Sequence, residues 1–189
     1  MKKKAIIYFL YMLPIFASGC EQPGKKSSTQ IHAVSNVTQS KVNDEKDFYA
    51  ALRLFKKELA VKNIGAVAQC MHFPFYTGQQ QLPDGRTGNI SDPISLQDFN
   101  TYKSSIYNRD VLRLLPATKD DNLSEIDNKT DDPYYLSVKK LTDSGSKLYE
   151  LYVQYAESNT QAENYFAFVF GRVNGKYKAV AYYAKWPVK

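Results

Sequence analysis

Two segments near the C-terminus, residues 165–173 and 176–186, have the two-residue period of β-strands and are joined by Asn174-Gly175. Asn-Gly between two such segments is the strongest short-range signal for a β-hairpin. In the first segment Phe166, Phe168 and Phe170 alternate with other, mostly apolar residues, so both faces are apolar. A strand of this kind belongs inside a sheet that is covered on both sides. The pattern therefore predicts a central strand of a sheet with two covered faces.

Two further strands are predicted at residues 135–141 and 147–157, on either side of the turn-forming segment 142–146. In the second strand Glu150, Tyr152 and Gln154 share one face. The other face carries Tyr149, Leu151, Val153 and Tyr155. Together with the Asn-Gly hairpin, these strands predict a four-stranded antiparallel meander.

Helical spacing dominates the part of the chain that precedes this meander. A helix capped by Asn43 or Asp44 is expected, because apolar residues then follow as one stripe: Phe48, Ala51, Leu52, Phe55 and Leu59. A short helix is expected at residues 64–71, and a third helix after Ser95, which has Asp98 three positions later. Residues 79–93 carry turn chemistry and predict a hairpin or a broad loop. Helices followed by a meander predict a single α+β domain over residues 45–189.

The order of these elements resembles a known superfamily. A helix, a short helix that leads into the extended His72-Phe73-Pro74-Phe75, a strand, a third helix and a curved aromatic meander are similar to the nuclear transport factor two-like, or cystatin-like roll, superfamily. The resemblance covers residues 45–187 and implies helices packed on a curved, cone-like antiparallel sheet. The superfamily includes isomerases, dehydratases, small-ligand binders and protein-interaction domains, so the resemblance does not select a function.

The first 19 residues are predicted to be a leader that takes no part in the fold. Three lysines precede an apolar run, residues 5–17, that is shorter than the roughly 20 residues needed to cross a bilayer. The run ends in Ala17, Ser18 and Gly19, followed by Cys20. This leader resembles a bacterial lipoprotein signal peptide, although Ala17 stands where such signals most often have leucine. A signal cleaved without lipidation and an uncleaved anchor are the alternatives.

The resemblance implies that Cys20 is lipidated and that the mature protein is anchored in the bacterial cell envelope. Glu21 follows the cysteine, where an aspartate would favour the inner membrane, so we expect the outer membrane, with the domain facing the periplasm. Residues 20–44 are polar, lack apolar periodicity and predict a flexible tether. Cys70 is then left without an intramolecular partner and is interpreted as a buried structural thiol, with a reactive thiol as the alternative.

Charge argues against a nucleic-acid-binding protein. The chain has 25 basic and 19 acidic residues, but three of the lysines belong to the leader. Removal of residues 1–19 leaves 170 residues with 22 basic and 19 acidic side chains, a net charge of +3. No run of lysines and arginines follows the leader, so the basic patch that nucleic-acid binding requires is not predicted.

No residue pattern points to a known catalytic, metal or cofactor site. His72 is the sole histidine of the predicted domain and is interpreted as a packing residue, with a general base as the alternative. No metal and no cofactor are expected, because ligand spacings and glycine-rich phosphate loops are lacking. Residues 117–133 hold six acidic and two basic residues. We interpret them as a solvated loop, with a basic protein partner as the next interpretation.

Tyrosine is the unusual component, with 13 residues after the leader. Tyrosine provides a large contact area with a polar tip and is enriched at interfaces. A small sheet can also use tyrosine simply to fill its core. The candidate binding surface is the sheet face expected to carry Tyr152 and Tyr182, together with His72.

Two functions are compatible with these features. The first is a lipid-anchored envelope protein whose domain binds a small ligand or another protein without catalysis, for example as an immunity or inhibitor protein. The alternative is a small isomerase- or hydrolase-like enzyme that uses the cone pocket, with His72 or a buried acid as base. A deep pocket with perturbed carboxylates would favour the enzyme. A filled cone and an exposed tyrosine face would favour the binding module.

Overall fold

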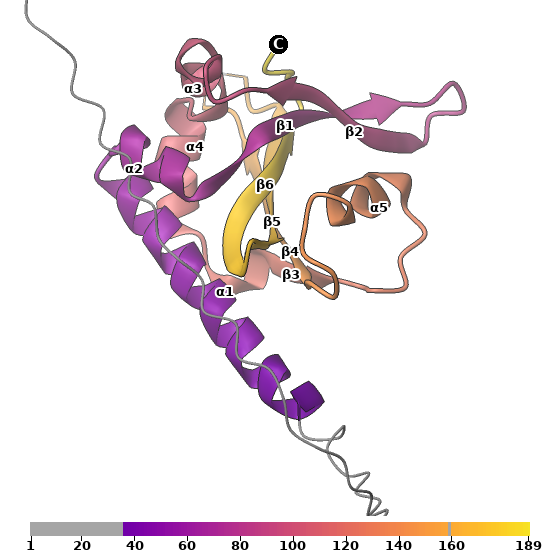
Figure 1. The fold of residues 1–189 in the computed structure, drawn as a ribbon. Helices are drawn as coiled ribbons and strands as arrows, with labels where there is room; N and C mark the ends of the chain where they lie inside the picture. The colour runs from indigo at the N-terminus through magenta and orange to yellow at the C-terminus, as the bar shows by residue number, and fades with distance from the viewer. Residues whose placement is uncertain (1–35, 159) are drawn as a thin grey trace, which may run out of the picture. The chain divides into compact units, whose positions relative to one another are not determined.

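A computed structural model describes residues 36–158 and 160–189 (Figure 1). The predicted signal peptide, Cys20 and most of the predicted tether lie outside these residues. The described part forms a six-stranded sheet in the order β2-β1-β6-β5-β4-β3. The strands are β1 (Met71–Gln81), β2 (Thr87–Ile94), β3 (Leu123–Ile126), β4 (Leu148–Ala156), β5 (Glu163–Val173) and β6 (Lys176–Ala184). Neighbouring strands are antiparallel, except that β1 and β6 are parallel.

Helices cover both faces of this sheet. One face carries α1 (Asn36–Ala60), α2 (Ile64–Gln69), α3 (Phe99–Ile106) and α4 (Arg109–Leu114). The short helix α5 (Pro133–Lys139) packs alone against the opposite face (Figure 1). The prediction of an α+β fold, with helices on a sheet, is confirmed. No helix in the described part of the chain has the length and apolar character needed to cross a membrane.

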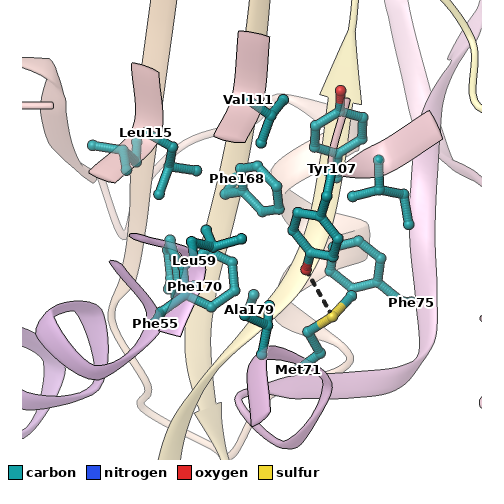
Figure 2. Close-up of a cluster of buried hydrophobic side chains, with 14 of the residues drawn as sticks. Phe55, Leu59, Met71, Phe75, Tyr107, Val111, Leu115, Phe168, Phe170 and Ala179 are labelled. Carbon is teal, nitrogen blue, oxygen red and sulfur yellow. Dashed lines mark hydrogen bonds between the residues drawn. The ribbon is translucent and has the colours of Figure 1, made fainter. Parts of the chain in front are cut away.

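The larger core fills the space between the sheet and the first four helices. Phe55 and Leu59 of α1 are fully buried there, as the apolar stripe predicted. Phe168 lies at the centre, and its ring is 5.4 Å from that of Phe55 and 4.9 Å from that of Tyr182 (Figure 2 shows the first of these two contacts). The Tyr107 hydroxyl donates a hydrogen bond to the sulfur of Met71, 2.9 Å away. Aromatic and aliphatic side chains therefore occupy the interior where a cone pocket was expected.

The smaller core lies on the other face, under α5. Its buried members are Tyr134, Val138, Leu148, Val169, Val173, Val180 and Ala181. β5 contributes to both cores, since Phe168 points to one and Val169 to the other. The prediction that this strand is central and covered on both faces is confirmed.

The Asn-Gly turn between β5 and β6 forms as predicted. Asn174 and Gly175 both have positive φ angles, 51° and 75°, as a two-residue hairpin turn of type I′ requires. The carboxylate of Asp143 accepts hydrogen bonds from both backbone N–H groups, at 2.9 and 2.8 Å. Asp143 had been assigned to a hairpin loop of its own, but it instead supports this neighbouring turn.

Three boundaries differ from the sequence predictions. Residues 135–141 were expected to be a strand, but residues 133–139 form α5, so the meander has three long strands. The fourth strand next to these three is β3, which pairs with β4. It lies within residues 117–133, which were expected to be a loop. The first helix begins at Asn36, inside the predicted tether and well before Asp44. Asp44 is 6% exposed and forms an ion pair with Arg172 of β5, so the folded domain includes the end of the predicted tether.

Candidate functional site: a tyrosine face around Glu150

The three residues predicted to share a binding surface do not come together. Tyr182 is 1% exposed and belongs to the large core beneath the helices. Tyr152 is partly buried on the opposite face of the sheet, where it pairs across the strands with Ala167. His72 lies on β1 near Lys178, and burial, followed by the charge of Lys178, lowers its pKa. The prediction for Tyr182 and for a common surface was therefore wrong.

A β-bulge in β6 is the reason for the misplaced Tyr182. Phe170 of β5 pairs with Ala179, whereas Val169, one residue back along β5, pairs with Ala181. β6 therefore has one extra residue at this point, and Val180 and Ala181 both lie on the side of the smaller core. An inserted residue exchanges the two faces for every side chain beyond it. The bulge sends Tyr182 into the large core and brings Tyr183 to the face of Tyr152.

Four of the partly buried tyrosines on that face lie around Glu150: Tyr135, Tyr152, Tyr165 and Tyr183. We call them, with Glu150, the tyrosine face. The rings of Tyr152 and Tyr165 stack with their centroids 5.8 Å apart and an interplanar angle of 24°. Tyr183 meets the ring of Tyr165 edge-on at 6.3 Å. Ala167 is fully buried and pairs with Tyr152 on one side and with Tyr183 on the other. Because its side chain is small, it leaves room for these rings to lie across the sheet.

Glu150 is the acidic centre of this face. It is 8% exposed and lies on β4, on the same side as Tyr152. One carboxylate oxygen, Oε2, accepts hydrogen bonds from the hydroxyl of Tyr135 at 2.6 Å and from that of Tyr183 at 3.0 Å. The other oxygen, Oε1, accepts no hydrogen bond from any residue that the structure describes. One tyrosine of helix α5 and one of strand β6 thus donate hydrogen bonds to the same carboxylate oxygen.

Glu150 has no ion-pair partner among the residues that the structure describes. No lysine, arginine or histidine in the described ranges forms an ion pair with it. Burial raises the pKa of the Glu150 carboxyl, the two tyrosine hydrogen bonds lower it, and the nearby Asp132 raises it. Burial also raises the pKa of the Tyr183 hydroxyl, and the charge of Glu150 raises it further. Burial and the hydrogen bond to Glu150 likewise raise the pKa of the Tyr135 hydroxyl, so both tyrosines are protonated donors at neutral pH.

Helix α5 positions Tyr135 over the carboxylate. Asp132 caps the helix, since its Oδ1 accepts the backbone N–H of Tyr134 at 2.8 Å, and Pro133 occupies the first turn. Tyr134 is fully buried against the sheet, and its ring meets that of Tyr183 edge-on at 5.5 Å. Its hydroxyl is buried without a hydrogen-bond partner among the described residues. The helix is thus fixed by Tyr134 and presents the adjacent Tyr135 to Glu150.

Sequence reasoning placed Glu150 on the correct face but did not identify it as a site. The available signal was its isolation, because it is the single charged residue within the strand 148–156. A second signal was Asp132-Pro133, which is a typical helix start and would have moved Tyr135 from a strand to a helix. Tyr183 could not have been assigned to this face from the sequence, because its place there depends on the bulge in β6.

A second concave region lies between α1 and the start of β6. This groove has a volume of about 470 Å³ and is lined by Leu54, Cys70, Lys176, Lys178 and neighbouring residues. Cys70 packs against the large core, and burial, followed by the charge of Glu58, raises its thiol pKa while Lys178 lowers it. A raised pKa disfavours the reactive thiolate, which supports the interpretation of Cys70 as a structural thiol. Within the described ranges, no hydrogen bond links the Cys70 sulfur to Asp47 or to another base that lines the groove.

No described group of three or more histidine, cysteine, aspartate or glutamate side chains lies close enough to hold a metal ion. The acidic residues of the segment 120–132 are distributed over a short helical turn, β3 and a loop. What the tyrosine face offers is an aromatic surface with one buried, unneutralised carboxylate. The chain matches no protein-family model, and no curated protein sequence matches it significantly.

Proposed function

We propose that the chain is a lipid-anchored protein of the bacterial envelope and that its folded domain binds a protein partner through the tyrosine face. The observation that carries the second part is the gathering of four partly buried tyrosines around Glu150 on one side of the sheet. Tyrosine is enriched in the centres of protein interfaces because its rigid ring buries a large area and its hydroxyl can still be satisfied.

The filled interior supports a binding role over catalysis in a cone pocket. Phe55, Phe168 and Tyr182 are buried where a substrate would have to enter. His72, the proposed base of the enzyme alternative, has a pKa that burial and the charge of Lys178 both lower. One observation favours the alternative, namely the raised pKa of Glu150. Its Oε2 is nevertheless occupied by two tyrosine hydroxyls, which suits a fixed recognition group better than a proton-transfer group.

The anchor is proposed from the leader alone. A lipid on Cys20 would hold the domain within a few nanometres of a membrane surface, and an immunity or inhibitor protein that meets an incoming protein there is one form of this function. To test the anchor, cells that express the protein or Cys20→Ser are fed a labelled fatty acid. We expect label on the wild type alone, and label on Cys20→Ser would refute the assignment.

Site-specific photo-crosslinking tests the binding surface. Tyr165 is replaced by the photo-reactive p-benzoylphenylalanine, and Tyr102 of α3 is replaced in a matched variant. Tyr102 is also partly buried, but it packs against the core on the other side of the sheet. Irradiation in the envelope of the native host is expected to give a defined protein adduct from position 165 and none from position 102. The absence of adducts at 165, or the same adducts at both positions, would overturn the proposal.

A further inference from the structure

We infer that the tyrosine face is a receptor for an arginine side chain of the partner, whose guanidinium group lies among the tyrosine rings and pairs with Glu150. The inference rests on the proposed function, because it specifies the chemistry of the protein partner. It follows from three properties of the face: an incompletely satisfied carboxylate, partly exposed aromatic rings and a local excess of negative charge.

The first property is the state of the carboxylate. A buried carboxylate without a cation is costly, and proteins normally pair such a group. Glu150 is more than nine-tenths buried, yet no described cation pairs with it. The tyrosine hydroxyls satisfy Oε2, whereas Oε1 accepts no hydrogen bond from the described residues. The face therefore retains one acceptor that a donor from outside can satisfy.

The second property is the aromatic surround. Tyr152 and Tyr165 form a stacked pair and Tyr183 stands edge-on to it, so that three rings border one area beside Glu150. The face of an aromatic ring attracts a cation, and arginine is the most frequent cation in such contacts. A guanidinium is planar and can stack on one ring while its N–H groups reach a carboxylate. Lysine, a strongly hydrated point charge, fits this combination less well.

The third property is the charge of the adjoining segment. Residues 120–132 contain six acidic residues and one lysine. Lys147 pairs with Glu125, and Lys139 of α5 donates hydrogen bonds to the backbone carbonyls of Asp127 and Asn128, which leaves a smaller negative excess around Asp132. The last of the acidic residues, Asp132, lies close enough to Glu150 to raise its pKa. A cationic partner would relieve this repulsion, and the negative potential would increase its rate of encounter. An anionic or neutral partner would leave the repulsion in place.

The test uses the folded protein with labelled tyrosine rings and follows their NMR resonances. The probe is N-acetyl-arginine N-methylamide, and its neutral isostere N-acetyl-citrulline N-methylamide is the matched control. We expect the arginine probe to shift Tyr152, Tyr165 and Tyr183 with a dissociation constant on the order of 1 mM, and the citrulline probe to bind at least about tenfold more weakly. Tyr102 should not shift with either probe.

Two variants locate the interaction. Glu150→Gln keeps the shape of the side chain and an acceptor for the tyrosine hydroxyls. It should raise the dissociation constant of the arginine probe by about tenfold. Tyr152→Ala removes one ring, leaves the carboxylate in place and should also weaken binding of the arginine probe. This variant keeps the test valid if Glu150→Gln unfolds. Equal binding of the citrulline probe, or full binding by both variants, would overturn the inference. A lysine analogue that binds as tightly as arginine would overturn the choice of arginine.

The outcome separates this inference from the proposed function. A defined crosslink at position 165 without a preference for the arginine probe would leave the protein-binding role standing and remove the arginine receptor. Selective binding of the arginine probe with no crosslink at position 165 would retain the guanidinium-binding site and remove the protein-binding role.

Discussion

Tyr182 and Tyr183 are neighbours in β6, yet their rings lie on opposite faces of the sheet. Tyr182 packs 4.9 Å from Phe168 in the large core. Tyr183 donates a hydrogen bond to Glu150 on the other face. The bulge at Val180 and Ala181 decides which of the two tyrosines is structural and which belongs to the candidate site.

This division predicts different costs for the two alanine substitutions. Tyr182→Ala should lower the free energy of unfolding by about 4 kcal/mol, because it leaves a cavity among rings that cannot close it. Tyr183→Ala should cost roughly 2 kcal/mol, since its ring is only partly buried and the main loss is one hydrogen bond to a charged group. Denaturant unfolding of both variants measures the difference. The opposite order would place Tyr182 at the surface and contradict the bulge.

Glu150 should make stability depend on pH in an unusual direction. Its pKa is raised in the folded protein, mainly by burial, and Tyr135, Tyr183, Tyr134 and Asp132 surround it. At a pH just above 4.5, the ordinary pKa of the group, the Glu150 carboxyl is therefore protonated more often in the folded state than in the unfolded state. The free energy of unfolding of the wild type, relative to Glu150→Gln, should rise as the pH falls toward 4.5.

Glu157 provides the control of opposite sign. Hydrogen bonds from Thr160 and Trp186 lower its pKa, so its contribution to stability is lost as the pH falls below 4.5. Relative to Glu157→Gln, the wild type should thus lose stability in acid. Thermal unfolding of the three proteins from pH 7 to pH 3 checks both signs. Parallel curves for wild type and Glu150→Gln would show that Glu150 is not perturbed.

The ion pair between Asp44 and Arg172 should hold α1 on the sheet. Asp44→Ala removes the buried partner and should lower the free energy of unfolding by about 3 kcal/mol, at the low end for buried pairs because Arg172 remains 31% exposed. Asp47, one turn later on the same helix, is exposed, so Asp47→Ala should change stability by less than about 0.5 kcal/mol. Equal effects of the two substitutions in urea unfolding would indicate that residues around Asp44 belong to the tether after all.

Much of the fold could be predicted from local patterns. The stripe of α1, the short α2, the Asn-Gly hairpin and the two-faced β5 depend on side-chain periodicity and turn chemistry, which are properties of the segment itself. The parallel pairing of β1 with β6 could not be predicted, because these strands are about one hundred residues apart and nothing local specifies the partner. The four-residue β3 is too short to show a period.

Helix α5 was mistaken for a strand because Tyr134, Tyr135 and Val138 favour strands by composition. Tertiary contacts decide the structure here, since Tyr134, Ser137 and Val138 share one buried helical face. The candidate site depends on this helix and on the bulge, so sequence reasoning located Tyr152 and the correct face of Glu150 but not Tyr135 or Tyr183. Alternation cannot reveal a bulge, because the extra residue, with apolar neighbours on both sides, looks like any other strand residue.

The affinity of the crosslinked partner for Tyr152→Ala, compared with Tyr102→Ala, tests the central claim most directly. Tyr152 lies on the tyrosine face and is partly buried, so its loss should weaken binding by about thirtyfold, as expected for an interface residue that contributes about 2 kcal/mol. Tyr102→Ala should bind as the wild type does. Calorimetric titration measures both. Unchanged affinity for Tyr152→Ala, or an equal loss for the two variants, would contradict a protein-binding role of this face.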